Sequence, residues 1–384
     1  MAVTVKTLFN NGAYLYQMKL IAGREGLGNL VHWVHIIEDD DASAFLHGGE
    51  LVFTAGILNR RHDWLSGFVH KLLSAGASAF VVNLGPHTTE IPAEVSALCD
   101  KAGLPLFTIP WETRMVDMTR DFCQRLIQAE QTEQSIMTAM KNLLFHVGEQ
   151  EPQVLLMERH GFQRNAQYCF VCVQPDEPGD PEAVRLVLKN IAERKAREMG
   201  GLHVSFTYHD ARVFLLSNFP DDDIDSFVMH FMQEAAYRLP TLHLRMGLSP
   251  NLPGLCDQIG NFEKAMAALD AARKGRESLV RYEQLGLLKI LYAVKDKSVL
   301  KQYHTDVLGR LDAFDAENGA SLCALLKDYL ALEGSLQAVA EKHFVHRNTV
   351  TNALRRIETL TGIDPSSING KVVFSLALRV REIS

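Results

Sequence analysis

The chain has 384 residues, of which 47% are hydrophobic and 22% are charged, a composition typical of soluble globular proteins. Because this length exceeds that of one ordinary hydrophobic core, we expect two or three domains. The formal net charge of −7 argues against a wholly basic surface. It still allows one small nucleic-acid-binding module, which needs only a local basic footprint.

Neither a membrane segment nor a disulfide framework is expected. No apolar run reaches the roughly 18 residues that a bilayer-spanning helix needs, and the first residues show no basic-then-apolar signal. The six cysteines are scattered along the chain, which favours a reducing compartment over paired disulfides. We therefore expect a cytoplasmic protein without a membrane partner.

Residues 1–114 alternate between short apolar runs and helical patterns. Strands bounded by Gly, Pro or Asp are expected at residues 30–37, 51–56, 78–82 and 104–110. Helices are expected at residues 62–76 and 92–103, and both end at a glycine. Strands separated by helices pair in parallel and have both faces covered, so this region predicts an α/β sandwich.

A candidate effector site follows from this sandwich, because ligands of open α/β sheets bind beyond the carboxyl ends of parallel strands. The residues expected there are Glu38, Asp39, Thr54, Gly56, Asn83, Trp111 and Arg114. Trp111 can stack on a planar ring, Asn83 and Arg114 can bond carbonyl groups, and Gly56 permits close backbone approach. In the alternative interpretation, Trp111 only packs at the start of the next helix. Nothing in these residues identifies the ligand.

Residues 115–150 carry apolar side chains spaced four and three residues apart, over about four to five heptads. The pattern, which Thr119 and Glu133 interrupt, predicts a long linker helix that forms a parallel dimerisation coiled coil. The residues expected in the dimer interface are Leu126, Ile136, Met140 and Leu143. The alternative is a helix that packs on its own domain.

Residues 151–297 show a different pattern. Strands are expected at residues 166–173, 203–208, 212–217 and 242–249, and helices at residues 182–199, 223–238 and 255–274. The two middle strands are joined by the tight turn His209-Asp210-Ala211. The order βαββαβ with a central hairpin predicts a ferredoxin-like α+β domain. A run of helices begins near Tyr282 and extends to the C-terminus.

Residues 298–384 are expected to form an all-α domain with a helix-turn-helix at about residues 335–361. Ser335 is a candidate N-cap of the first short helix, and the apolar side chains assigned to this helix are Ala338, Val339 and Phe344. His346 or Asn348 can cap the second helix. In the second helix Val350, Leu354 and Ile357 share one face, together with Thr361. The candidate DNA-contacting residues lie outside that face: Arg347, Asn348, Thr349, Thr351, Asn352, Arg355 and Arg356.

The chemistry of these residues suits double-stranded DNA. Arg can bond a guanine edge through two hydrogen bonds, Asn an adenine edge, and a Thr methyl group can contact thymine. The alternative is an ordinary solvated amphipathic helix. Because the C-terminal segment has only a slight basic excess, its non-specific affinity for DNA is expected to be modest. Dimerisation is then expected to be important for DNA binding.

The stretch "SLQAVAEKHFVHRNTVTNALRRIETLTGID" resembles the C-terminal helix-turn-helix of PucR-family bacterial transcription regulators. "GGELVFTAG" and "IPAEVSALCDKAGLPLFTIP" resemble the N-terminal PucR effector domain of that family, and "YHDARVFLL" and "RYEQLGLLKILY" its GGDEF-like middle domain. One departure is that family members often carry Tyr-Arg where this chain has Asn352-Ala353. Base contacts at Asn352 are therefore open.

The resemblance implies a metabolite-responsive transcription regulator, often an activator, of purine breakdown or of another nitrogen or carbon pathway. Its expected partners are an operator in double-stranded DNA, a small-molecule effector, and further copies of the chain in a homodimer or higher homo-oligomer. RNA polymerase is a further candidate partner. Neither a cofactor nor a metal is expected.

The competing class is a GGDEF-type nucleotide cyclase or a nucleotide-binding signalling protein. A cyclase needs a glycine pair at the hairpin and acidic residues for metal binding. The hairpin here, Tyr208 to Arg212, lacks the glycine pair, so we expect no enzyme. Cys169 and Cys172 lie three apart on a strand and are interpreted as small buried hydrophobes.

Overall fold

A computed structural model describes residues 3–58, 64–176, 181–256 and 258–383. The chain divides into two compact units. The first unit comprises Met1–Tyr168, Pro178–Leu242 and Asn251–Ile259, and the second comprises Cys169–Glu177, His243–Pro250 and Gly260–Ser384. Among the described helices, none combines the length and the apolar character that crossing a membrane would require.

The N-terminal sheet has the strand order β1-β5-β4-β3-β2. Its strands are β1 (Lys19–Ala22), β2 (Trp33–Ile36), β3 (Glu50–Thr54), β4 (Ala79–Leu84) and β5 (Leu106–Pro110). The four strands predicted from the sequence are parallel to one another. β1, which the apolar pattern missed, pairs antiparallel with β5 and forms one edge.

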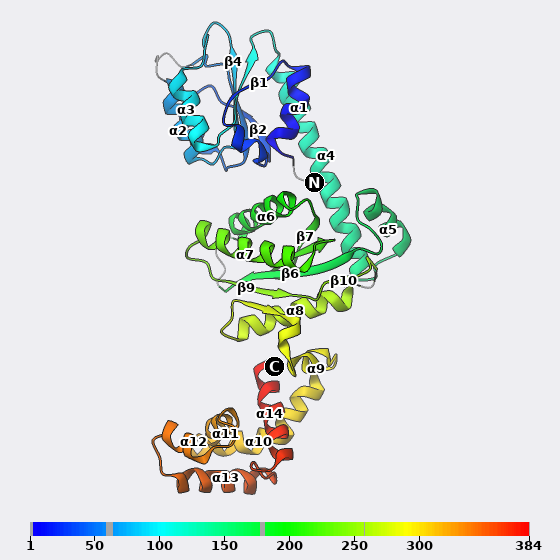
Figure 1. Cartoon of the computed structure of the whole chain (residues 1–384), viewed down its shortest axis with the longest axis vertical. Coiled ribbons are helices and arrows are strands. Elements are labelled where there is room, and N and C mark those ends of the chain that lie inside the picture. Colours follow the sequence, from blue (N-terminus) through cyan, green and yellow to red (C-terminus); the bar gives the residue numbers. More distant parts are fainter. Residues whose placement is uncertain (1–2, 59–63, 177–180, 257, 384) are drawn as a thin grey trace. The chain divides into compact units, whose positions relative to one another are not determined.

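Helices cover both faces of this sheet (Figure 1). Helices α1 (Val5–Leu15) and α4 (Met115–Leu144) lie on one face, and α2 (Trp64–Ser74) and α3 (Ala93–Ala102) on the other. Two short 3-10 turns, η1 (Arg24–Gly28) and η2 (Asp40–Phe45), complete this part. Residues 62 and 63 of the helix predicted at 62–76 lie outside the described residues. Because both faces are covered, β3 is buried at every position.

Helix α4 buries the residues that the sequence assigns to a dimer interface. The helix is continuous, as the sequence predicts, but Leu126, Ile136, Met140 and Leu143 are each at most 7% exposed within the chain itself. Leu126 belongs to the core of the N-terminal sandwich. These side chains contact their own chain, which favours the alternative interpretation of a helix that packs on its own domain. The heptad pattern arose because a helix that packs on its own domains also repeats its apolar face every three to four residues.

The middle elements follow in the predicted order, with two further strands. They are α5 (Gln150–Arg159), β6 (Gln167–Pro175), α6 (Pro181–Glu198), β7 (Leu202–Tyr208), β8 (Ala211–Ser217), α7 (Asp221–Arg238), β9 (Leu244–Leu248), β10 (Leu252–Pro253), α8 (Ile259–Lys274) and β11 (Leu279–Arg281). The strand order of the second sheet is β11-β9-β6-β8-β7, with β10 beside β6. Helix α5 and strands β10 and β11 were not predicted.

Two details of this region bear on the sequence predictions. The hairpin between β7 and β8 has a two-residue turn, because Tyr208 already pairs with Ala211 and His209 adopts a positive φ of 49°. Cys169 and Cys172 are both buried, and burial raises the pKa of the Cys172 thiol far above its usual range. Both cysteines behave as small hydrophobes, as predicted.

The C-terminal region is helical, as expected. It contains η3 (Tyr282–Leu285), α9 (Leu288–Ala293), α10 (Lys297–Asn318), α11 (Leu322–Ala331), α12 (Leu336–Lys342), α13 (Arg347–Thr361) and α14 (Ile368–Ile383). Helices α10 to α14 enclose one hydrophobic core, in which Leu308, Leu326 and Phe374 are fully buried. Figure 1 shows α13 at the outer edge of this helical group.

Candidate nucleic-acid interface and effector site

Helices α12 and α13 form the predicted helix-turn-helix, and side chains cap both of them. The Ser335 hydroxyl accepts a hydrogen bond of 3.2 Å from the amide of Ala338 at the start of α12. The Nδ1 atom of His346 accepts one of 3.2 Å from the amide of Asn348 at the start of α13. Helix α13 ends at Gly362, which has a left-handed φ of 75°. Of the two predicted caps for α13, the structure uses His346.

The apolar face of α13 is buried as the sequence predicts. Val350 and Ile357 are fully buried and Leu354 is 8% exposed, all in the core shared with α10, α11 and α14. Val339 and Ala340 of α12 belong to the same core. The orientation of α13 about its axis is therefore determined by hydrophobic packing, which leaves the opposite face in solvent.

The candidate DNA-contacting residues lie on the solvent side of α13. Six are exposed and Thr351 is partly buried: Arg347, Asn348, Thr349, Thr351, Asn352, Arg355 and Arg356. The side chains of Asn348, Asn352 and Arg355 make no hydrogen bond or ion pair with any described residue. Because they are three and four positions apart, they form one outward row that can reach a surface opposite the helix.

Two candidates differ from the rest of this row. The guanidinium of Arg356 lies over the ring of Phe314 in α10, 4.9 Å from the ring centroid, and so contacts the protein itself. The Thr351 hydroxyl donates to the Arg347 carbonyl oxygen at 3.2 Å, which leaves its methyl group as the free part. Both residues remain at the edge of the candidate interface, but the Arg356 guanidinium and the Thr351 hydroxyl already contact groups of the helical region itself.

Phe344 departs from the sequence prediction. Its apolar side chain was grouped with the first helix, yet it is 96% exposed and sits in the turn with a left-handed φ of 54°. A bulky residue is strained in this backbone conformation. Its ring therefore projects from the turn immediately before α13, and periodicity along a helix gives no signal for such a position.

Asp328 of α11 holds the end of α12 in place. Its two carboxylate oxygens lie 2.6 Å from the Lys342 ammonium and 2.8 Å from the His343 imidazole Nε2. The hydrogen bond from Lys342, followed by that from His343, lowers the pKa of Asp328 despite partial burial. The contact anchors the residues that lead into the turn.

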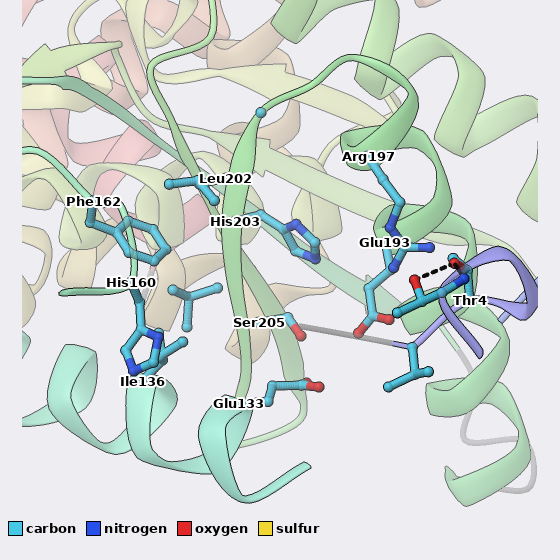
Figure 2. A pocket seen from close by; sticks show the side chains of 14 residues that line it. Thr4, Glu133, Ile136, His160, Phe162, Glu193, Arg197, Leu202, His203 and Ser205 are labelled. Carbon is cyan, nitrogen blue, oxygen red and sulfur yellow. Dashed lines mark hydrogen bonds between the residues drawn. The ribbon is translucent and has the colours of Figure 1, made fainter. Parts of the chain in front are cut away.

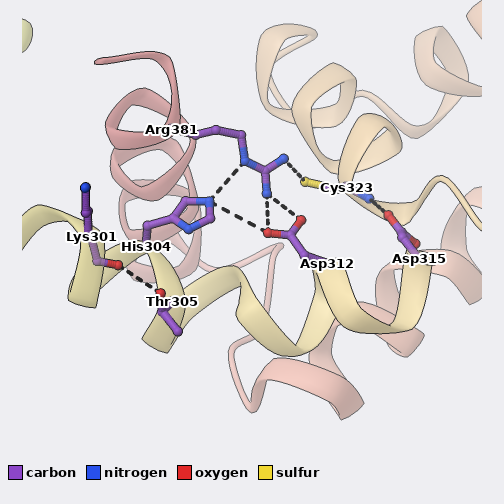
Figure 3. A network of polar contacts seen from close by, with 7 residues as sticks. All are labelled: Lys301, His304, Thr305, Asp312, Asp315, Cys323 and Arg381. Carbon is purple, nitrogen blue, oxygen red and sulfur yellow. Dashed lines mark hydrogen bonds and ion pairs between the residues drawn. The ribbon is translucent and has the colours of Figure 1, made fainter. Parts of the chain in front are cut away.

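A second polar network ties α14 to α10 and α11 (Figure 3). Arg381 of α14 bonds the carboxylate of Asp312 and donates to the Cys323 sulfur at 3.1 Å and to His304 Nε2 at 3.0 Å. Asp315 accepts from the backbone amides of residues 322 and 323, at 3.0 and 2.8 Å, and so caps α11. These contacts stabilise the support behind α13 and lie away from its exposed face.

The predicted effector residues gather at the carboxyl edge of the N-terminal sheet, but several already serve the chain's own turns. The Glu38 carboxylate accepts from the backbone amides of Ala55 and Ile57 at 2.8 and 2.9 Å. The Thr54 hydroxyl accepts from the Gly56 amide at 3.1 Å, and Asp39 caps η2. We infer that these four residues shape the edge more than they offer groups to a ligand.

Gly56 is required by packing at this edge. Its φ is 73°, and a Cβ atom there would lie 2.5 Å from the Thr88 hydroxyl and 2.8 Å from the Trp64 ring. The sequence interpretation gave the glycine a ligand-facing role. The close contact is instead with the chain's own side chains.

Among the predicted residues, Trp111 and Arg114 are exposed, and Asn83 is buried with one side-chain atom that lacks a hydrogen-bond partner. Asn83 is 3% exposed and donates to the carbonyl oxygens of residues 110 and 113 at 3.3 and 3.4 Å. Its Oδ1 has no hydrogen-bond partner among the described residues. Trp111 is 43% exposed, and Arg114 is exposed at the start of α4.

Two further residues of this edge were missed. The Thr88 hydroxyl is buried without a hydrogen-bond partner among the described residues, and the His87 ring lies 5.9 Å from the Trp111 ring. Both follow β4 within the loop "GPHTTE". The strand-end rule would have found them had the loop after β4 been included as well as the last strand residue.

Two family models match this chain. The purine catabolism regulatory protein-like family, PucR, matches residues 9–126, and the PucR C-terminal helix-turn-helix domain matches residues 322–380. The first match contains the five strands of the N-terminal sheet, α2, α3 and the start of α4. The second contains the capped helix pair, α11 and most of α14.

Similar proteins cover only parts of this chain. An uncharacterized protein of Mycobacterium tuberculosis is 37% identical over 89 residues, 23% of this chain and 20% of that protein. The proline-responsive transcriptional activator PutR of Bacillus subtilis is 25% identical over 166 residues, 42% of this chain and 39% of PutR. The crystal structure of a regulator of polyketide synthase expression from Bifidobacterium adolescentis is 21% identical, covers 64% of this chain and 97% of that chain, and has a TM-score of 0.33.

Proposed function

The chain carries the N-terminal PucR domain and the C-terminal helix-turn-helix domain of the PucR-type transcriptional regulators. From that premise we propose that it controls a catabolic pathway in response to a small metabolite. The observation that carries the DNA-binding part is the exposed row Asn348, Asn352 and Arg355 on a helix whose other face is buried. In a helix-turn-helix, the N-terminal part of the second helix contacts base edges.

The domain roles are part of the proposal. Residues 1–114 sense the effector, and residues 115–150 form the helix that links them to the middle domain. Residues 151–297 form a degenerate GGDEF-like domain, and residues 298–384 bind DNA. The order βαββαβ and the two-residue hairpin support the third assignment. We assign this domain no catalysis.

The DNA-binding proposal is tested by fluorescence anisotropy with DNA from the promoter of the chain's own operon and with shuffled DNA of equal length. The proposal requires tighter binding to one natural sequence than to the shuffled control, and a binding constant that falls with salt. Equal binding to both would refute sequence-specific regulation.

The effector is proposed to be a small nitrogen-containing metabolite bound at the carboxyl edge of the N-terminal sheet. The purine catabolism description of the matching family supports a purine-related compound. The name of PutR shows that a similar regulator responds to proline, so the class extends to other nitrogen or carbon compounds. Asn83 Oδ1 and the Thr88 hydroxyl can accept from N–H groups, and the exposed face of Trp111 can stack on a ring.

A thermal-shift screen of purine-pathway compounds and amino acids tests this site, because a ligand stabilises the state that it binds. The hit compound should lose its effect in Trp111→Ala and retain it in Trp33→Ala, a matched exposed tryptophan on β2. A hit that stabilises both variants equally would place the site elsewhere.

We further propose that the regulator acts as a homodimer, which reads two half-sites about one helical turn apart or a multiple of it. The effector would shift the populations of two dimer arrangements and so change operator affinity. Light scattering tests the dimer directly: a monomeric mass at concentrations that saturate the operator would refute it.

The alternative function is a nucleotide cyclase or nucleotide-binding protein built on the middle domain. Its hairpin turn consists of His209 and Asp210 without a glycine pair, which disfavours close approach of a phosphate. Incubation with GTP and magnesium separates the two functions. The regulator proposal predicts no cyclic dinucleotide product.

A further inference from the structure

A cavity of about 440 Å³ lies in the first unit, away from the effector edge. Its walls come from the N-terminal segment, α4, the α5–β6 loop, α6 and β7 (Figure 2). Ligand pockets have volumes of roughly 300–1,000 Å³, whereas one water molecule occupies about 30 Å³. The cavity is therefore large enough for a small organic molecule.

The cavity wall is mainly apolar, with a few polar groups that converge. Ile136, Phe162 and Val204 are each at most 7% exposed and supply apolar surface. Figure 2 shows Glu193 of α6 and His203 of β7 directed into the same space. An apolar cavity with a few convergent polar groups is typical of a small-molecule site.

Glu193 is the strongest sign of a ligand. The side chain is 3% exposed, and its Oε2 atom has no hydrogen-bond partner among the described residues. Its other oxygen lies 3.4 Å from the Lys189 ammonium, which lies closer, at 2.7 Å, to Glu133. Buried carboxylate oxygens are normally hydrogen-bonded, so a donor from a bound molecule fits this position.

His203 adds a second unused polar group. Loss of hydration lowers the pKa of its imidazole to about 4, so the ring is neutral near pH 7 and offers one donor and one acceptor nitrogen. No described residue forms a hydrogen bond with this ring. Ser205, next but one on β7, already accepts from Arg212 at 2.9 Å.

The charges around the cavity favour a neutral ligand. Glu133 and Glu193 are balanced by Lys189 and Arg197, and Arg212 lies behind Ser205. An added cation would lie against Arg197, with Lys189 and Arg212 behind the wall, and an added anion would face the unpaired Glu193 oxygen. A neutral group that carries both an N–H donor and a carbonyl acceptor can donate to the Glu193 oxygen and accept from the Arg197 side of the cavity.

We propose that this cavity binds a small neutral aromatic or heteroaromatic molecule with an amide-type N–H and C=O pair. The N–H donates to Glu193 Oε2, His203 bonds the same polar edge, and the ring lies against Ile136 and Phe162. The site is independent of the effector edge and does not rest on the proposed DNA-binding function.

The test uses three isosteric probes that differ in charge: neutral benzamide, cationic benzamidine and anionic benzoate, each at millimolar concentration with the full-length chain. Saturation-transfer NMR should give a signal for benzamide that exceeds those of the two charged probes at least threefold. No benzamide signal, or equal signals for all three, would overturn the proposal.

Variants locate the bound probe. Glu193→Leu should abolish the benzamide signal, whereas Glu198→Leu, which removes an exposed carboxylate of the same helix, should retain it. Should Glu193→Leu not fold, Thr7→Trp offers a second variant, because it fills the rim of the cavity and leaves Glu193 unchanged. A signal that survives in Thr7→Trp would contradict the site. Trp111→Ala should retain the benzamide signal, so failure of the effector site is distinguishable from failure here.

Discussion

Arg356 places its guanidinium over the ring of Phe314, with the guanidinium carbon 4.9 Å from the ring centroid. Because Arg356 belongs to α13 and Phe314 to α10, the contact ties the exposed helix to the helix behind it. The adjacent Arg355 is exposed and has no such contact with any described residue. Two neighbouring arginines of one basic pair therefore have different roles.

Alanine substitution of each arginine should separate DNA contact from helix support. Arg355→Ala should weaken operator binding by about 1–3 kcal/mol and leave the free energy of unfolding unchanged. Arg356→Ala should lower the free energy of unfolding by about 0.5–1 kcal/mol through loss of the cation–π contact. Anisotropy titrations and urea denaturation of both variants measure these effects, and equal losses of DNA affinity would contradict the distinction.

The turn residue Phe344 should matter for DNA and not for folding. Phe344→Asn replaces a strained bulky residue by one that tolerates a left-handed φ, so the free energy of unfolding should stay the same or rise by up to about 1 kcal/mol. If the exposed ring contacts DNA, for instance a thymine methyl group, operator affinity should fall by about 1 kcal/mol. Unchanged affinity in an anisotropy titration would show that the ring faces away from DNA.

The cap of α13 can be tested with a matched pair of substitutions. His346→Ala removes the acceptor for the Asn348 amide and should destabilise the C-terminal region by about 1 kcal/mol. His346→Ser supplies another acceptor and should recover most of that loss. Thermal unfolding followed by circular dichroism measures both, and equal melting temperatures of the two variants would mean that the cap is unimportant.

The sequence predicted much of the architecture because its local signals agree with the fold. The buried strands of the N-terminal sheet read as apolar runs bounded by turn residues, and α13 carries both a capping residue and a clean apolar face, Val350, Leu354 and Ile357. By contrast, β1 is a four-residue edge strand with little buried surface. A strand that short gives no periodic pattern to detect.

The sequence does not reveal which polar groups of a candidate site are already hydrogen-bonded within the chain, for physical reasons. A carboxylate such as Glu38 looks free in sequence, yet it satisfies the backbone amides of a neighbouring turn. The cavity around Glu193 combines residues of α6 and β7 with residues of α4 that are distant in sequence, so no local motif signals it. Tertiary contacts decide which polar groups remain available to a ligand. Periodicity in the sequence identifies only the buried face of a single helix.

Helix α4 gives a prediction opposite to that of a coiled-coil interface. Met140→Asp buries a charge at a position that is fully enclosed by the chain, so it should cost several kcal/mol and cause partial unfolding. Ile127→Asp, at a 42% exposed position of the same helix, should be tolerated. Thermal denaturation with light scattering distinguishes the outcomes: a stably folded monomer from Met140→Asp would restore the coiled-coil interpretation.

Asp328 predicts how the stability of the C-terminal region depends on pH. Lys342, and then His343, lower the pKa of this carboxyl group in the folded chain. Near the acid transition the unfolded chain therefore binds more protons than the folded one. The stabilisation is fully present above the ordinary aspartate pKa of about 4 and is lost as the pH falls through the lowered folded value.

Asp328→Asn should remove this contribution. At neutral pH the variant should be less stable by about 1 kcal/mol or less, since the carboxylate is partly exposed to solvent. The difference from the parent chain should disappear at a pH below the folded pKa, where the aspartate is protonated in both states. Glu317→Gln at the exposed end of α10 serves as the control and should show no such difference. Urea denaturation from neutral to strongly acidic pH measures the effect, and a constant gap between Asp328→Asn and the parent chain at every pH would contradict the link to Lys342 and His343.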